Sequence, residues 1–248
     1  MTRSGEALTI KYVRNNKTMK TSITPVKAED QYKIGLWVRD AAAGVGTVTF
    51  YEPETNMFMS LGHGITDIDT EKIVEISTGE LVTANILSIN KGKKGSPGEI
   101  RGTIENGNTI GTIYKNTNFG VYGTVTNKNY LNLTNSALEV ASRDEIKEGK
   151  AQILCQLDNT GTKTYEIEIE KIYKNNNIDN KSMFIKVTDQ DLIEKTGGII
   201  QGMSGAPIIQ NGKFIGAVTN VLINDPTQGY GVFGDILIKQ IRQNSCKY

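Results

Sequence analysis

The stretch "GGIIQGMSGAPIIQNGKFIG", from Gly197 to Gly216, decides how this chain is interpreted. Near its middle lies Ser204, with Gly202 and Gly205 close on either side and Pro207 just beyond. A serine in a turn is ordinary, but small residues on both sides indicate that another group approaches its hydroxyl and its backbone closely.

The motif G-x-S-G-x-P at this point is typical of acyl-transfer chemistry, in which a serine hydroxyl attacks a carbonyl carbon. The developing oxyanion needs two backbone N–H donors, and a glycine-rich turn can present those of Gly202 and Ser204. The nucleophile elbow G-x-S-x-G fits poorly, because a helix must follow that serine, whereas Pro207 and "IIQNGKF" continue as strand and hairpin. A serine in a purely structural turn is the alternative reading of this motif.

His63 is the candidate general base. It is the only histidine of the chain, it follows the apolar segment "MFMSLG", and glycines stand at positions 62 and 64. A hydrogen-bonded structural histidine is the alternative, but the separation of His63 from Ser204 is typical of two-barrel serine proteases. The pair therefore predicts a serine nucleophile activated by a histidine base.

The acid that would orient His63 is the weakest part of this prediction. Two-barrel proteases carry an aspartate a few dozen residues after the histidine, and this chain has none between Asp69 and Asp144. Asp67 lies in the same loop as His63, while Asp189 and Asp191 lie just before the serine motif. Either of the latter two has the alternative role of starting a short helix at "DLIEK".

Composition excludes several classes of function. The chain has 248 residues with 28 Lys and Arg against 27 Asp and Glu, so no basic surface for nucleic acid is expected. One histidine and two distant cysteines, Cys155 and Cys246, predict neither a metal site nor a cofactor, although a single disulfide stays open. Cys155 is also a rival nucleophile, but "AQILCQL" is typical of a buried strand. No signal peptide or membrane span is predicted from this sequence.

Short segments rich in Ile, Val, Thr, Tyr and Phe, separated by Gly, Asn, Asp and Pro, predict an all-β barrel architecture. Asn211-Gly212 predicts a hairpin between two of them, and residues 72–78 are among the expected strands. Helical turns are expected at residues 142–149, where Ser142 and Glu145 have capping-box spacing, and at 191–198. Residues 234–244 predict a C-terminal helix.

Three segments, "LGHGITD", "TGGIIQGMSGAPIIQNGKFIGAVT" and "NDPTQGYGVF", resemble the peptidase domain of the stage IV sporulation protein B (SpoIVB) family. The resemblance implies a chymotrypsin-like, two-barrel serine endopeptidase with Ser204 as its nucleophile and His63 as its base. It also implies Asp189 as the acid. By the same resemblance, residues 1–27 correspond to the last strands of a PDZ domain and residues 28–248 to the peptidase domain.

The resemblance further implies that the protein cleaves itself in trans and acts in proteolytic signalling during endospore formation, which leads to activation of a late sigma factor. The implied substrate is a regulatory component of a membrane-embedded metalloprotease complex. The implied location is the intermembrane space of the developing spore, into which the forespore secretes a full-length protein that carries a membrane anchor.

The strand after the serine hairpin is expected to line the substrate cleft. Its residues Gly216, Ala217, Thr219 and Asn220 are uncharged, so no demand for a charged side chain before the scissile bond is predicted. The family pattern has histidine where this chain has Asn220, which leaves His63 as the only imidazole base. The rival function is therefore a non-catalytic, protease-like binding or regulatory module.

Overall fold

The computed structural model describes residues 4–36, 42–131, 137–174 and 180–245. It divides into a first unit, residues 1–44, and a second unit, residues 45–248. The first unit contains two antiparallel pairs: β1 (Leu8–Arg14) with β2 (Lys17–Ile23), and β3 (Val26–Ala28) with β4 (Gln31–Lys33). The predicted boundary after residue 27 lies within β3, and the prediction of a PDZ remnant stays a prediction.

The second unit begins with an open five-stranded antiparallel sheet in the order β5-β6-β9-β8-β7. Its strands are β5 (Val48–Glu52), β6 (Met57–Ser60), β7 (Gly79–Asn90), β8 (Glu99–Thr117) and β9 (Gly120–Val125). A short 3₁₀ turn, η1 (Lys128–Tyr130), follows. The expected strand at residues 72–78 is wrong: Ile73 forms only an isolated bridge with Thr66, because the segment closes the loop that begins near His63.

The rest of the second unit is a closed six-stranded barrel in the order β10-β11-β12-β15-β14-β13. Its strands are β10 (Gly149–Gln156), β11 (Thr162–Ile172), β12 (Met183–Val187), β13 (Pro207–Gln210), β14 (Lys213–Leu222) and β15 (Asp225–Phe233). Asn211 and Gly212 join β13 to β14 with positive φ angles of 52° and 76°, which confirms the predicted two-residue hairpin. The all-β architecture is thus confirmed, with one lobe open and one closed.

Two helices occur in the described part of the chain, α1 (Gln190–Thr196) and α2 (Gly234–Ser245). Gly197 ends α1 in the left-handed conformation, with φ of 76°. The predicted helix at residues 142–149 is wrong. The Glu145 carboxylate accepts the Ser142 N–H and hydroxyl, but the Glu145 N–H donates to the backbone oxygen of Ser142, and the segment makes a single turn and then enters β10.

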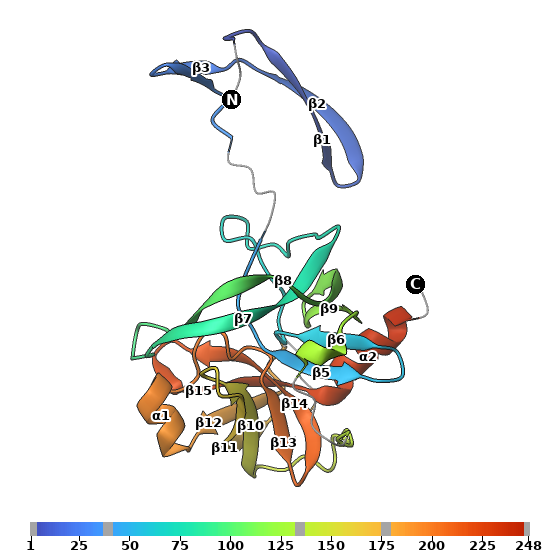
Figure 1. Cartoon of the computed structure of the whole chain (residues 1–248), viewed down its shortest axis with the longest axis vertical. Helices are drawn as coiled ribbons and strands as arrows, with labels where there is room; N and C mark the ends of the chain where they lie inside the picture. The colour runs from blue at the N-terminus through green and yellow to red at the C-terminus, as the bar shows by residue number, and fades with distance from the viewer. Residues whose placement is uncertain (1–3, 37–41, 132–136, 175–179, 246–248) are drawn as a thin grey trace. The chain divides into compact units, whose positions relative to one another are not determined.

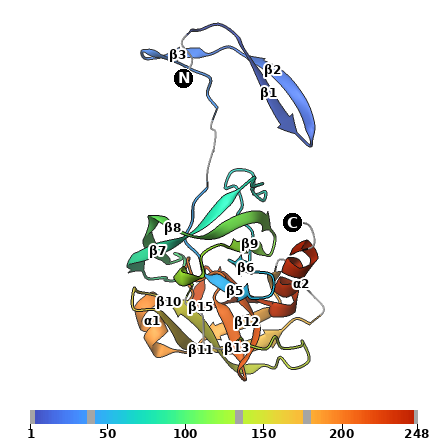
Figure 2. The ribbon, with the colours of Figure 1, turned by 45° about the vertical axis from the view of Figure 1, so that its right-hand side comes forward.

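The main hydrophobic core fills the barrel and continues under the open sheet. Apolar residues alternate inward along β10 and β11, and β6 and β8 add Met59 and Ile100 to the same cluster. Figures 1 and 2 show the open sheet on one side of the second unit and the barrel strands on the other, with α2 beside β6. The two lobes therefore share one core, which fixes the loops at their junction. No described helix is long and apolar enough to cross a membrane.

Gln210 fastens the segment before β10 to the barrel. Its buried side chain accepts the Lys147 N–H at 3.0 Å and donates to the carbonyl oxygens of Lys147 at 2.9 Å and Lys150 at 3.0 Å. We expect Gln210→Ala to lower the free energy of unfolding by about 2–3 kcal/mol, because buried backbone groups lose their partners. Denaturant unfolding measures this, with Gln152→Ala, an exposed glutamine on β10, as control. Equal losses in both variants would contradict the prediction.

Candidate active site

The serine turn is held in a conformation that only small residues allow. Gly202 and Gly205 have positive φ angles of 101° and 90°. A Cβ atom on Gly205 would lie 2.4 Å from Thr47 O, and one on Gly202 would lie 2.9 Å from the Cβ of Ile100. Both glycines next to Ser204 are therefore required by close packing against the open sheet.

Thr47, just before β5, binds the serine turn to the lobe that carries His63. Its N–H donates to Ser204 O at 3.0 Å, and its hydroxyl donates to Gly202 O at 2.9 Å. Its own carbonyl oxygen accepts the Leu61 N–H at 3.3 Å, two residues before His63. One residue thus links both halves of the candidate site.

His63 lies in a short loop after β6 and is half-buried. A Cβ on Gly62 would lie 3.1 Å from the Cγ2 of Thr219, and one on Gly64 would lie 2.6 Å from Thr117 O. The loop therefore passes between the barrel strand β14 and the turn that joins β8 to β9. The two glycines beside His63 let the backbone enter this narrow space.

Thr219 brings the two halves of the site together from the barrel side. Its carbonyl oxygen accepts the Ser204 hydroxyl at 3.3 Å, and its methyl group packs against Gly62. In the described conformation Ser204 donates to Thr219 and not to His63. Proton transfer to the imidazole therefore requires the Ser204 hydroxyl to leave Thr219 O, and catalytic hydrogen bonds often form only once substrate is bound.

The imidazole of His63 is oriented by a backbone carbonyl. Its Nδ1 lies 3.0 Å from Gly64 O. A proton on Nδ1 donates to this oxygen and leaves the lone pair on Nε2, which is the tautomer that a general base needs. No carboxylate hydrogen-bonds to this imidazole in the part of the chain that the structure describes.

The candidate acids all have partners of their own. Asp189 is the N-cap of α1: its Oδ1 accepts the Leu192 N–H at 3.0 Å and its Oδ2 accepts the Glu166 N–H at 3.2 Å. Asp191 forms an ion pair with Lys195 at 2.6 Å on the same helix. Asp67 Oδ1 accepts from the backbone of Asp69 and from Thr70 within its own loop. The structure does not bring Asp189 to His63, and its role as triad acid stays a prediction.

Two buried asparagines hold the His63 loop, and the sequence analysis missed both. The Asn116 amide accepts the Ile65 N–H at 2.9 Å and donates to Ile65 O at 2.7 Å and Val74 O at 3.0 Å. The Asn180 side-chain amide donates to Gly62 O at 3.3 Å and to Asn118 O, and the backbone carbonyl oxygen of Asn180 accepts the Thr219 hydroxyl at 3.2 Å. Nothing in their sequence neighbourhoods signals these contacts, because every partner of Asn180 is distant in the chain.

The oxyanion donors predicted from the sequence are available. Within the described residues, the N–H groups of Gly202 and Ser204 donate to no acceptor, whereas those of Met203 and Gly205 do. Unpaired N–H groups beside a serine hydroxyl are the arrangement that a developing oxyanion requires. Both N–H groups are therefore free to bind a carbonyl oxygen, and their role as oxyanion donors stays a prediction.

The four residues of β14 that were predicted to bind substrate lie in two different settings, and their role stays a prediction. Gly216 and Ala217 pair with β13 on one side and β15 on the other and are buried, so they lie inside the barrel wall. Beyond Ala217 no described strand pairs with β14 on the β13 side. The open edge therefore starts at Thr219 and continues through the exposed Asn220 to Leu222, where an extended peptide can add as a strand.

The rival cysteine nucleophile is excluded by its surroundings. Cys155 is buried within β10, and burial, with a smaller contribution from the charge of Asp189, raises the pKa of its thiol to about 12. A neutral, buried thiol is a poor nucleophile at physiological pH. Cys246 lies outside the described residues. Among those residues no cluster of His, Cys, Asp and Glu has the arrangement of a metal site.

Comparison with known proteins identifies the relatives of the chain. The family model "SpoIVB peptidase S55" matches residues 30–238. No curated protein sequence matched the chain.

Solved structures with similar folds share little sequence with this chain. The active form of the Rv3671c protease from M. tuberculosis is 14% identical, with a TM-score of 0.40, over 84% of this chain and 93% of its own. The HtrA-type protease AlgW with a decapeptide is 14% identical, with a TM-score of 0.43, over 94% and 54%. Human heparin binding protein is 13% identical, with a TM-score of 0.39, over 78% and 83%.

Asn180 is expected to position His63. Asn180→Ala removes the donor to Gly62 O, so we expect kcat to fall about 10- to 100-fold with a smaller change in KM, because the imidazole is misplaced. Steady-state kinetics on a peptide substrate, at a temperature where the variant is folded, measures this. Asn56→Ala is the control. Asn56 has a φ of 56°, close to the 58° of Asn180, but it lies in the exposed turn between β5 and β6. An equal fall in the control would contradict a positioning role.

Asp189 can be tested separately as a helix cap. Asp189→Ala should lower the free energy of unfolding by about 1 kcal/mol, whereas Asp189→Asn keeps a capping oxygen and most of the stability. Thermal or denaturant unfolding of both variants checks this. Because the Asn variant is folded and capped, any loss of kcat in it reports the carboxylate charge itself. Equal stability of the Ala variant and the unsubstituted protein would contradict the capping role.

Proposed function

Because the chain belongs to the SpoIVB peptidase family S55, we propose that it is a serine endopeptidase with Ser204 as nucleophile and His63 as general base. The observation that carries this proposal is that the Ser204 turn and the loop of His63 meet at Thr219 and Thr47, from opposite lobes: Ser204 bonds to both threonines, while Gly62 and Leu61 contact them from the His63 loop. The free N–H groups of Gly202 and Ser204 beside the hydroxyl support it further.

The proposed reaction follows from the positions of these groups. His63 Nε2 takes the proton of the Ser204 hydroxyl as Oγ attacks the carbonyl carbon of the peptide bond. The carbonyl oxygen becomes an oxyanion that accepts from the N–H groups of Gly202 and Ser204. The proton on Nε2 then passes to the leaving amine, and water, deprotonated by the same imidazole, hydrolyses the acyl-enzyme.

Which group orients His63 depends on the conformation of the site. In the described one, Gly64 O orients His63, and the Asp189 carboxylate is occupied by two backbone N–H groups. For Asp189 to act as the acid, its side chain must leave Leu192 and Glu166 and turn toward the cleft. A structure of the complex with a transition-state analogue would show whether the Asp189 side chain moves in this way.

The side chain before the scissile bond is expected to be uncharged. Asn220 and Val221 of β14 are open on the β13 side, and on their other side they pair with Tyr230 and Gly229 of β15. A Cβ on Gly229 would lie 2.7 Å from the Cδ1 of the buried Ile199, so the space beneath this edge is apolar and already filled. A charged side chain buried there would have no partner for its charge.

The biological role is proposed from the family alone. We propose self-cleavage in trans and proteolytic signalling during endospore formation, on a regulatory component of a membrane-embedded metalloprotease complex. The proposed site of action is the intermembrane space of the developing spore. Mass spectrometry of the purified protein, searched for termini that Ser204→Ala lacks, tests self-cleavage directly.

One observation favours the rival function, a non-catalytic binding or regulatory module. Ser204 donates to Thr219, and no carboxylate contacts His63 in the described residues, so a complete Ser-His-Asp triad is not assembled. A module of this kind would bind a peptide along β14 and leave it intact. Labelling by a fluorophosphonate, which reacts only with an activated serine, separates the two functions.

We expect a fluorophosphonate probe to label the protein at Ser204 and Ser204→Ala to abolish both labelling and peptide cleavage. The loss of kcat should be on the order of 10³- to 10⁶-fold, as for loss of a nucleophile elsewhere. Cys155→Ala is the control and should retain kcat, because the buried thiol takes no part. Cleavage at a normal rate by a folded Ser204→Ala protein would contradict the proposed function.

A further inference from the structure

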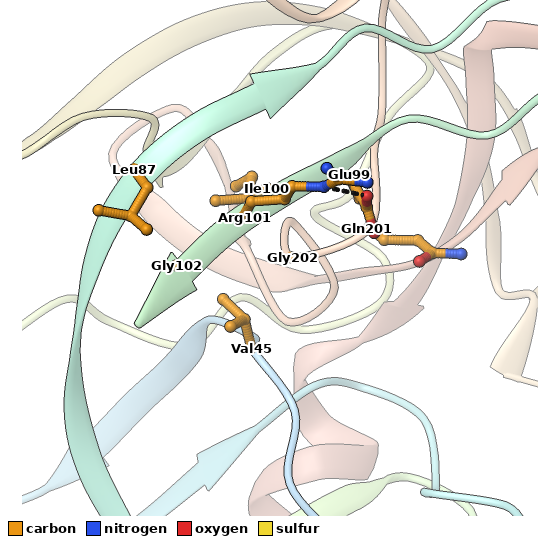
Figure 3. Close-up of a pocket in the computed structure, with 8 residues that line it drawn as sticks. All are labelled: Val45, Leu87, Glu99, Ile100, Arg101, Gly102, Gln201 and Gly202. Carbon is orange, nitrogen blue, oxygen red and sulfur yellow. Dashed lines mark hydrogen bonds and ion pairs between the residues drawn. The ribbon is translucent and has the colours of Figure 1, made fainter. Parts of the chain in front are cut away.

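A pocket of about 520 Å³ opens beside the serine turn and is not used by the chemistry described above. It is lined by Val45, Leu87, Glu99, Ile100, Arg101, Gly102, Gln201 and Gly202 (Figure 3). All of these residues except Gln201 and Gly202 come from the open-sheet lobe, and none belongs to β14 or β15. The pocket therefore borders Gly202 without including any residue of the open edge of β14.

The wall of this pocket is fixed rigidly to the serine turn. The Ile100 N–H donates to Gln201 O at 2.8 Å, and the Gln201 N–H donates to Gly98 O at 2.9 Å. Ile100 also packs directly on Gly202: a Cβ atom added to Gly202 would lie 2.9 Å from the Cβ of Ile100. The start of β8 is thus held at a constant distance from the proposed oxyanion donor.

Leu87 enters the pocket because β7 is irregular at this residue. The register between β7 and β8 shifts between Ile86 and Ser88, which leaves Leu87 as an extra residue in a β-bulge. The Asn159 amide binds the backbone of Ile86 at 3.0 and 3.2 Å and so holds the bulge from the barrel side. Leu87 is 67% exposed, so its side chain is accessible to a ligand in the pocket.

The lining chemistry suits an uncharged, apolar side chain. Val45, Leu87 and Ile100 provide its apolar surface, as the close-up in Figure 3 shows. The one cation and the one anion of the lining, Arg101 and Glu99, neutralise each other through an ion pair of 2.6 Å. A charged ligand would have to break this pair, whereas an apolar one leaves it intact.

We propose that this pocket binds an apolar side chain at one of the first two substrate residues after the scissile bond. The proposal rests on the proposed function, since it takes the substrate to be a polypeptide cleaved by Ser204. An extended substrate paired with β14 at Thr219–Leu222 places its scissile carbonyl oxygen at Gly202 and Ser204. Its next residues then continue past Gly202 toward β8 and the pocket, at about 3.3 Å per residue.

The test compares substrates with and without residues after the scissile bond. Leu87→Ala should lower kcat/KM about tenfold for peptides with leucine or methionine in the first two positions after the bond. The same variant should leave kcat/KM unchanged for a fluorogenic substrate whose leaving group is an arylamine, since nothing then reaches the pocket. Ile104→Ala is the control, because Ile104 is also an exposed apolar residue of the β7–β8 hairpin but lies outside the pocket.

Unaltered peptide preference in Leu87→Ala, or an equal loss on the arylamine substrate, would overturn the pocket assignment. So would a wild-type preference for charged residues after the scissile bond, measured with a peptide library. These failures differ from failure of the proposed function. If the proposed function is wrong, the wild-type protein will cleave neither the peptides nor the arylamine substrate, or Ser204→Ala will cleave them equally well.

Discussion

The hydrogen bonds of Thr47 are the constraint on which the rest of the site depends. This residue donates to the carbonyl oxygens of Ser204 and Gly202 and accepts from Leu61. The serine turn belongs to the barrel and the histidine loop to the open sheet, so no local interaction places one against the other. Because the shared core holds the lobes together, Thr47 keeps the serine turn and the His63 loop at a fixed spacing.

Glycine is needed wherever these segments touch. Each of the four glycines closest to Ser204 and His63 would place a Cβ within about 3 Å of a neighbouring atom, as measured at Gly62, Gly64, Gly202 and Gly205. In three of the four cases a backbone oxygen lies among the nearest neighbours, which cannot move aside as a flexible side chain can. The spacing of glycines in the sequence thus reflects close packing, between the lobes at Gly62, Gly202 and Gly205 and within the open-sheet lobe at Gly64, rather than loop flexibility alone.

The parts of the structure that the sequence predicted are those with local causes. Ser204 and His63 stood out through their neighbouring glycines, and the Asn211-Gly212 hairpin through its requirement for positive φ. Strand β8 was missed because glycine and asparagine interrupt it, and its pairing with β7 and β9 outweighs their low strand propensity. Asp189 could be recognised as a helix cap from its position, but no sequence pattern shows which way its carboxylate points.

The asparagines that hold the histidine loop show why the rest of the site was hidden. Asn180 contacts Gly62, Asn118 and Thr219, which come from three segments joined only by the fold. The side-chain amide of Asn180 donates, and that of Asn116 both donates and accepts, so the two satisfy backbone groups of the histidine loop without burying a charge. The partner of the His63 imidazole is likewise neutral, with Gly64 O on its Nδ1. In this conformation that hydrogen bond orients the imidazole, and a carboxylate can take the place of Gly64 O only after it moves.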